Sequence, residues 1–162
     1  SAFVRDGRLV RSDDFGAGVA EHMVAVPLGA PCYCGNRGCF ETLLGAKALE
    51  RRAGTTVPRF FEMLQAHDPN AMRLWDRYLD SLALLIHNLR MVACGDVVIG
   101  GRLSRYLAQS DLRALRTKVT GNGELSMRDF HLLCGHYLDE ATALGAGIMV
   151  IDRYLETWKQ AE

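Results

Sequence analysis

The residues of this sequence best suited to chemistry are three cysteines, Cys32, Cys34 and Cys39, and one histidine, His22, that precedes them. Written as ligands, they read His22-x9-Cys32-x-Cys34-x4-Cys39. Zinc prefers four nitrogen or sulfur donors in a tetrahedron, and three thiolates with one imidazole are a common structural set. The pattern therefore predicts a zinc site. Because all four ligands would be protein groups, zinc there would stabilise structure and would not activate water.

The same thiols have two alternative roles, as disulfides or as ordinary cysteines beside a surface turn. The chain has five cysteines, an odd number, and a Cys-x-Cys pair is poorly placed to close a disulfide with itself. Clustered cysteines in a reducing compartment more often indicate metal binding or catalysis than crosslinks. Gly35 and Gly38 flank the turn between the second and third thiols, where they permit backbone conformations that turn N–H groups toward sulfur. These glycines favour the metal site.

The composition excludes several classes of partner. Lys and Arg number 19, as do Asp and Glu, so the formal net charge is zero. A chain without net charge has no global field that would attract it to nucleic acid or to an anionic membrane. No apolar run is long enough to cross a bilayer, and the first residues carry charges where a signal peptide needs apolar ones. We expect a cytoplasmic chain of 162 residues, about the length of one domain.

The elements that would position the cysteines begin with a β-hairpin. Residues 2–11 contain two short β-prone runs around Asp6-Gly7, a dipeptide preferred in tight hairpin turns. A second extended run, residues 23–27, leads into the cysteines. Periodicity after that predicts helices over residues 41–54, 57–67, 70–94, 110–119, 127–133 and 139–158, with a buried strand over 96–101. This order predicts a single α/β domain, residues 1–162.

Residues 21–42 closely resemble the zinc signature of the ROK family, the bacterial repressors and sugar kinases. The family pattern is His-x9-Cys-x-Cys-Gly-x2-Gly-Cys-x-Glu. Every element of it is present: His22, Cys32, Cys34, Gly35, Gly38, Cys39 and Glu41. Three further segments resemble family segments in the same order: the hairpin 6–12, the strand and glycine loop 97–104, and the Gly-Ala stretch 144–150. The resemblance covers nearly the whole chain, but only about the C-terminal half of a family member.

The resemblance implies an actin-like, ribonuclease-H-like fold of two lobes, with sugar and nucleotide bound in the cleft between them. This chain would be the C-terminal lobe, and its partners would be a small sugar or sugar phosphate, the N-terminal lobe of the same protein and a second copy in a homodimer. Family kinases carry the phosphate motif and the catalytic aspartate in the other half, and family repressors carry a DNA-binding domain there. We therefore expect the chain alone to be neither catalytic nor DNA-binding.

The resemblance also assigns ligand contacts. In the family the zinc-ligand histidine faces the sugar, which corresponds to His22, and Glu41 matches a glutamate that accepts bonds from sugar hydroxyls. An ionised carboxylate accepts two or more such bonds, which suits a polyol. The alternative for Glu41 is a helix N-terminal carboxylate favoured by the helix dipole. Gly100 and Gly101 match the nucleotide loop, where ATP would bind if the protein is a kinase, although a Gly-Gly pair after a strand is also an ordinary tight turn.

Two positions depart from the family pattern. Val19 stands where the family usually has another sugar-binding glutamate, and valine cannot accept a hydrogen bond. Leaving a buried hydroxyl without an acceptor costs about 1–3 kcal/mol. Glu21 cannot simply replace it, because neighbouring residues on an extended chain point to opposite faces. Arg102 stands where the nucleotide loop usually has a third glycine, so its side chain would crowd the adenosine or reach a phosphate.

Three functions follow, in order of preference. The first is the sugar-sensing lobe of a ROK transcriptional regulator, because both departures weaken a kinase more than a sensor. The second is the same lobe of an ATP-dependent hexose or amino-sugar kinase. The third is a zinc-stabilised interaction module that binds no sugar.

The remaining histidines and cysteines considered as sites, and the glycines near residue 145, have structural interpretations. His131, Cys134 and His136 resemble a second metal site, but on a helix His136 would point away from the other two, so we expect no metal there. We expect Cys94 to be a buried small hydrophobe. The Gly-Ala stretch near residue 145 predicts close helix packing, because glycine inside a helix otherwise costs about 1 kcal/mol against alanine.

Overall fold

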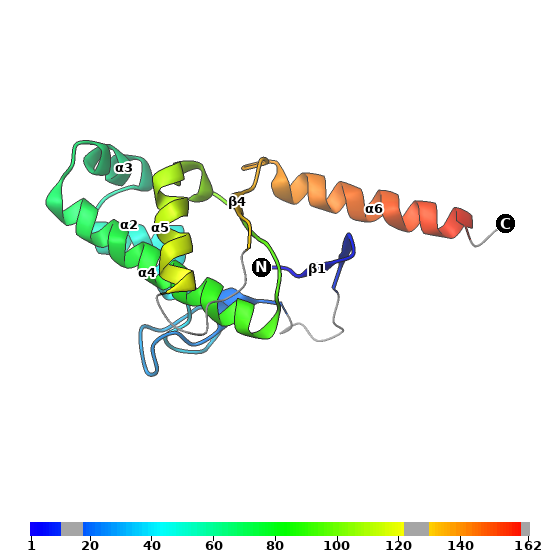
Figure 1. Cartoon of the computed structure of the whole chain (residues 1–162), viewed down its shortest axis with the longest axis horizontal. Helices are drawn as coiled ribbons and strands as arrows, with labels where there is room; N and C mark the ends of the chain where they lie inside the picture. The colour runs from blue at the N-terminus through cyan, green and yellow to red at the C-terminus, as the bar shows by residue number, and fades with distance from the viewer. Residues whose placement is uncertain (11–17, 122–129, 160–162) are drawn as a thin grey trace.

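The computed structural model describes residues 1–10, 18–121 and 130–159. A long helix, α4 (Pro69–Val92), is the centre of the molecule. Around it lie α1 (Glu41–Leu44), α2 (Ala46–Ala53), α3 (Val57–Gln65) and α5 (Gln109–Thr120), as Figure 1 shows. The predicted helices over 41–54, 57–67, 70–94 and 110–119 are therefore present, although the first is interrupted at Gly45, where the backbone is extended.

Local signals in the sequence account for the ends of α4 and α2. The Asp68 carboxylate caps α4 by accepting hydrogen bonds from the backbone N–H groups of Asn70 and Ala71, both at 2.9 Å. Pro69 occupies the first helical position, where its missing N–H has no cost. Gly54 ends α2 in the left-handed region, with φ of 66°.

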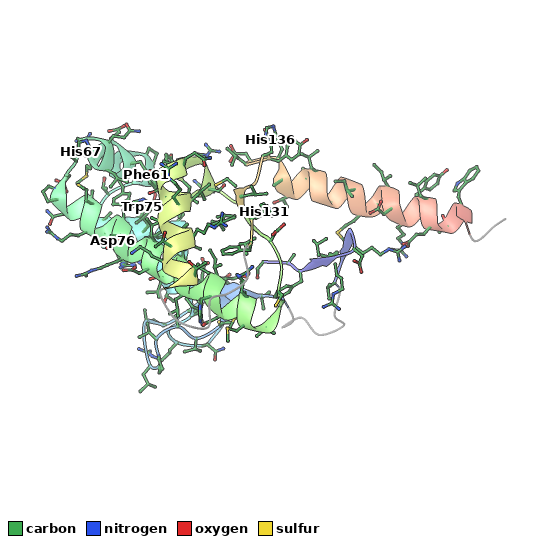
Figure 2. All side chains as sticks on the ribbon, in the orientation of Figure 1. Phe61, His67, Trp75, Asp76, His131 and His136 are labelled. Atoms are coloured by element: carbon green, nitrogen blue, oxygen red, sulfur yellow. The ribbon has the colours of Figure 1, made fainter. Side chains whose placement is uncertain are left out.

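The core lies on the face of α4 that meets α3 and α5. Figure 2 shows Phe61 and Trp75 there, and their ring centroids are 5.0 Å apart in an edge-to-face arrangement. The indole N–H of Trp75 donates to Asp111 at 3.1 Å, and the second oxygen of that carboxylate accepts from the Ala108 N–H at the start of α5. One side chain thus caps α5 and joins it to α4.

Two small sheets complete the described fold. β1 (Val4–Arg5) and β2 (Arg8–Leu9) form the predicted hairpin, with positive φ at both Asp6 and Gly7 in the turn. β3 (Val97–Ile99) pairs in parallel with β4 (Leu132–Cys134), Val97 opposite Leu132 and Ile99 opposite Cys134. The predicted helix over 127–133 is wrong at its described end, because residues 132–133 are strand. Residues 127–129 lie outside the described part.

The final helix, α6 (Ala141–Lys159), extends away from the helical body (Figure 1). Its apolar side chains are exposed: Leu144, Ile148, Met149, Val150, Ile151, Tyr154, Leu155 and Trp158. A Cβ atom added at Gly145 or Gly147 would meet nothing within 4 Å, so no described segment packs closely on the Gly-Ala stretch. Among the described helices, α6 included, none combines the length and hydropathy needed to cross a membrane.

Candidate metal centre

A short antiparallel arrangement brings the three cysteines together. Isolated bridges join Val24 to Cys39 and Pro31 to Arg37, and the Cys32 N–H donates to the Asn36 carbonyl at 2.8 Å. The next residue after Cys39 is Phe40, which is fully buried and anchors the loop on the body of the protein. The extended run predicted at 23–27 is thus limited to a single bridge, while Ala20–His22 forms a turn of 3₁₀-helix, η1.

Gly38 is the residue that allows the two sides of the loop to close. Its φ is 72°, and a Cβ atom there would lie 1.7 Å from the Val26 carbonyl oxygen. The Gly38 carbonyl accepts hydrogen bonds from the N–H groups of Ala25 and Val26, at 2.8 and 3.0 Å. No other residue fits, because both the backbone conformation and the contact exclude a side chain.

The four predicted ligand atoms lie within 4.8 Å of one another. The Cys32 Sγ is 3.5 Å from the His22 Nδ1, and the Cys34 Sγ is 3.6 Å from the Cys39 Sγ. A tetrahedral zinc ion with ordinary bond lengths separates two sulfurs by about 3.8 Å and a sulfur from a nitrogen by about 3.5 Å. The donor set and its spacing therefore fit zinc. All five cysteines are free, as the odd number suggested.

The electrostatics of the thiols also favour a bound metal ion. Burial and the neighbouring thiols raise the pKa of Cys39 to about 12, whereas the backbone hydrogen bond from Asn36 lowers the pKa of the exposed Cys34. A thiolate at the buried position needs a compensating positive charge. A coordinated divalent cation supplies that charge and deprotonates its thiol ligands.

His22 is half-buried, and its Nδ1 is the ring nitrogen on the side of the thiols. Coordination through Nδ1 would fix the ring and leave Nε2 able to bond a ligand hydroxyl. The exposed ring of Tyr33 meets the His22 ring edge-on, with centroids 4.9 Å apart. Sequence reasoning missed Tyr33 as part of this site. The one sign of Tyr33 in the sequence was that an aromatic residue stands between two of the cysteines.

Glu41 is the first residue of α1 and follows the metal ligands by two positions. Its carboxylate lies against the backbone at Gly45, where an added Cβ would be 2.5 Å from Oε1. The Glu41 charge contributes, after burial, to raising the pKa values of both Tyr33 and Tyr78. The carboxylate lies at the N-terminus of a helix, as its alternative role requires, and its contact with a sugar stays a prediction.

The first departure from the family pattern, Val19, and the nearby Glu21 both have defined positions in the structure. Val19 immediately precedes η1 and is half-buried. Glu21 lies inside η1, so the expectation of an extended chain there is wrong. Its carboxylate accepts a hydrogen bond from the Ser1 hydroxyl at 2.7 Å. Glu21 thus bonds Ser1, and that it does not replace the acceptor missing at Val19 stays a prediction.

The predicted nucleotide loop follows β3. Gly101 has a φ of 84°, and a Cβ atom at Gly100 or Gly101 would meet nothing within 4 Å. The buried Ser104 hydroxyl closes the turn by donating to the Gly101 carbonyl at 2.7 Å. Arg102 is exposed. The loop is open on its outer side, and nucleotide binding there stays a prediction.

The group His131, Cys134 and His136 does not lie on a helix, because Cys134 is in β4. His131 instead contacts Asp96, which accepts from the His131 N–H at 2.9 Å and lies 3.1 Å from its Nδ1 (His131 is labelled in Figure 2). Among the described residues, the one His/Cys group spaced for a metal is the cluster at His22. Cys94 is exposed, so its predicted burial is wrong: α4 ends at Val92, before it can carry Cys94 into the core.

Comparison with known proteins decides the family. The model of the ROK family matches residues 1–153. The chain belongs to the ROK family. It is 32% identical over 152 residues to an N-acetylmannosamine kinase of Citrobacter koseri, covering 90% of this chain and 51% of that protein. It is 30% identical over 158 residues to the N-acetylmannosamine kinase of an Escherichia coli O7:K1 strain, covering 94% and 53%.

Solved ROK structures share the fold. A ROK hexokinase from Thermus thermophilus aligns with a TM-score of 0.76 at 28% identity over 93% of this chain and 54% of its own. A ROK glucokinase from Streptomyces griseus, solved with glucose and AMPPNP, aligns with a TM-score of 0.77 at 20% identity over 88% and 54%. The predicted actin-like, ribonuclease-H-like fold class is confirmed. The chain spans about half the length of the ROK relatives it matches.

Proposed function

We propose that this chain is the C-terminal, zinc-stabilised half of a ROK sugar kinase that transfers phosphate from ATP to a hexose or N-acetylhexosamine. The observation that supports this most is the four-donor metal cluster that includes His22, with Glu41 two residues after its last ligand, in a chain about 30% identical to N-acetylmannosamine kinases over nearly its whole length. This reverses the order preferred from the sequence alone, where a regulator came first.

In this proposal the metal positions the sugar-binding groups. Zinc held by Cys32, Cys34, Cys39 and Nδ1 of His22 would supply structural rigidity to the loop. The His22 Nε2 and the Glu41 carboxylate would then bond neighbouring sugar hydroxyls. Charge-assisted hydrogen bonds to a carboxylate are about twice as strong as neutral ones, so Glu41 would carry more of the affinity.

The phosphate donor would bind at the loop after β3. Gly100 and Gly101 leave the backbone accessible on the outer side, which suits a close approach by ATP. Arg102 would reach toward a phosphate oxygen, because a guanidinium binds oxyanions well. The catalytic aspartate and the remaining phosphate contacts would come from the other half of the protein.

The other half would also cover surface that is exposed here. The apolar side chains of α6 are exposed, as are Val98 and Leu133 on the outer face of the β3–β4 sheet, and the matched relatives are about twice as long as this chain. We propose that the N-terminal lobe of the same protein packs on α6.

The test uses the full-length protein, zinc-loaded, with ATP and a panel of hexoses and N-acetylhexosamines. Phosphorylation of at least one sugar is expected, and Glu41→Ala should lower kcat/KM by about ten- to a hundredfold. Glu62→Ala, an exposed carboxylate on α3, is the matched control and should have no effect. Absence of phosphorylation by the parent protein across the panel would contradict the kinase.

A regulator that senses sugar is the second candidate, favoured by Val19. A protein that only senses a sugar tolerates the loss of one hydrogen-bond acceptor. Weaker binding raises the sugar concentration at which such a protein responds, and no catalytic step is impaired. Sugar binding without phosphorylation in the same experiment would support it. Absence of both would leave the zinc-stabilised interaction module.

A further inference from the structure

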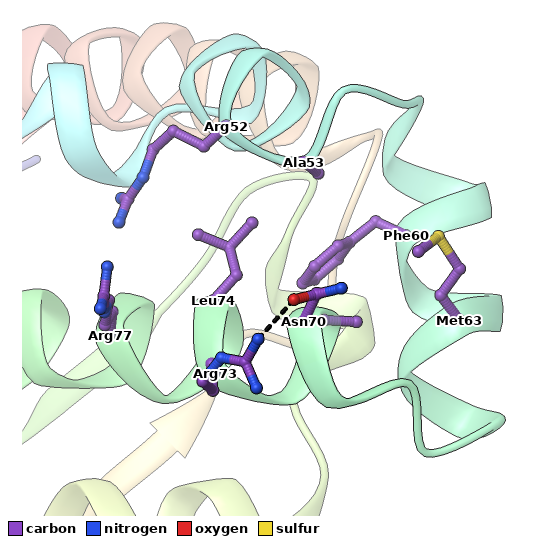
Figure 3. A pocket seen from close by; sticks show the side chains of 9 residues that line it. Arg52, Ala53, Phe60, Met63, Asn70, Arg73, Leu74 and Arg77 are labelled. Atoms are coloured by element: carbon purple, nitrogen blue, oxygen red, sulfur yellow. Dashed lines mark hydrogen bonds between the residues drawn. The ribbon is translucent and has the colours of Figure 1, made fainter.

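A second site is suggested by a pocket on the outer face of α2, α3 and α4. The cavity has a volume of about 190 Å³ and is lined by Arg52, Ala53, Phe60, Met63, Asn70, Ala71, Arg73, Leu74 and Arg77. Leu74 and Met63, both half-buried, form an apolar floor with the buried Phe60 behind it, while three arginines surround the opening (Figure 3). The pocket shares no residue with the His22–Glu41 site or with the loop after β3.

The charges around this pocket are unbalanced. No carboxylate is among the lining residues. Arg52 reaches from α2 toward Arg77 on α4, and Figure 3 shows the two guanidinium groups facing each other across the opening. Arg73 and Arg77 are four residues apart on one helix, where like charges destabilise the helix slightly. An anion between these exposed cations would offset their mutual repulsion.

The acidic residues nearest in sequence do not neutralise these arginines. Asp76 and Asp80 flank Arg77, and Asp80 has the spacing for an ion pair with it. Both instead bind Lys118 on α5, at 3.0 and 2.5 Å, on another face of the helix. Within the described part of the chain, Arg73 bonds the neutral side chain of Asn70 and no carboxylate, and the Arg52 Nη1 is 3.4 Å from the Leu43 carbonyl.

We propose that this pocket binds a small phosphate ester, with the phosphate between Arg52 and Arg77 and the carbon skeleton on the apolar lining at Leu74 and Met63. Guanidinium groups bind phosphate through paired, charge-assisted hydrogen bonds. The cavity volume suits a compact metabolite such as a triose or hexose phosphate, since larger ligands occupy pockets of roughly 300–1,000 Å³. The apolar floor distinguishes an ester from free phosphate.

The test is calorimetry on the zinc-loaded full-length protein with glucose 6-phosphate, glycerol 3-phosphate, inorganic phosphate and glucose. Both esters should bind at least about tenfold more tightly than inorganic phosphate. The double variant Arg52→Gln/Arg77→Gln should lose about a hundredfold or more in ester affinity, about tenfold for each charged bond. The matched control, Arg51→Gln/Arg59→Gln, removes two exposed arginines, on α2 and α3, that do not line the pocket and should bind like the parent.

One further variant separates this site from the proposed sugar site, where a sugar phosphate could also bind. Ester binding that persists in Glu41→Ala and disappears in the double arginine variant supports the proposal. Ester binding lost in Glu41→Ala but retained in the arginine variant overturns it. Equal affinity for inorganic phosphate and the esters overturns the assignment to an ester, and no binding of any phosphate overturns the site. None of these results depends on whether the protein phosphorylates sugar.

Discussion

Cys39 combines full burial with a thiol whose pKa is raised to about 12, at the centre of four metal-binding groups. Without a cation this thiol stays neutral and packs as a small apolar group, whereas a bound cation would compensate the charge of its thiolate. The neighbouring Cys34 is exposed, so its side chain contributes to metal binding and little to packing. A substitution at Cys34 therefore tests metal binding with little effect on packing, whereas a substitution at Cys39 would change both.

The first prediction concerns Cys34→Ser. Serine keeps the size of the side chain but is a poor zinc ligand, so zinc content should fall from about one ion per chain and the melting temperature should decrease. Metal analysis and thermal unfolding measure the two effects. Cys94→Ser is the control, because Cys94 is also exposed and lies outside the cluster. A zinc-free protein of unchanged stability would contradict the metal site.

The second prediction concerns Val19→Glu in the full-length protein. If the sugar pocket around His22 and Glu41 is used, the restored acceptor should strengthen sugar binding by about one to two powers of ten. If it is not used, the new carboxylate is unpaired at a half-buried position and only destabilises the protein. Calorimetry with hexoses and N-acetylhexosamines, combined with thermal unfolding, distinguishes the two results.

Among the elements, α5 depends on one side chain for its attachment to α4. Asp111→Ala should destabilise the protein by about 1–3 kcal/mol, because it leaves the indole N–H of the buried Trp75 without its partner and removes the bond to the Ala108 N–H. Chemical denaturation gives the free energy of unfolding. Glu62→Ala removes only an exposed ion pair and should change that energy by less than about 0.5 kcal/mol.

The junction of β3 and β4 has a pH-dependent contact. The backbone N–H and ring of His131 hold the pKa of Asp96 below its usual value of 3.8. A lowered pKa in the folded state adds stability above about pH 4, and this stability is lost as the pH falls through the folded-state value. The melting temperature of Asp96→Asn should therefore be below that of the parent at pH 6, and the difference should shrink toward pH 3. Asp152→Asn, on the exposed face of α6, should show no such trend.

At the scale of the whole molecule, α6 is the least supported element. Its apolar side chains from Leu144 to Trp158 are exposed, and monomeric proteins rarely leave a large contiguous apolar surface in water. The isolated chain should bind a hydrophobic dye and self-associate, and the full-length protein should do so much less. A monomeric isolated chain without dye binding would contradict the proposal that another part of the protein packs on α6.

Much of the site was predictable from the sequence because it is local. His22, Cys32, Cys34 and Cys39 are close in the chain, and glycines at 35 and 38 are needed for one tight loop, so residue type and spacing were sufficient. The hairpin turn at Asp6-Gly7 and the capped start of α4 were predictable for the same reason.

Only the tertiary structure decided the features that depend on distant partners. Residues 132–134 form a strand because β3 offers them an edge and Asp96 fixes His131 across 35 positions of sequence. The arginine pocket exists because α2 and α4 place Arg52 and Arg77 face to face, while Lys118 of α5 occupies the acids that would have neutralised Arg77. A sequence pattern specifies which groups are available locally, whereas charge balance and strand pairing depend on which elements come together in space.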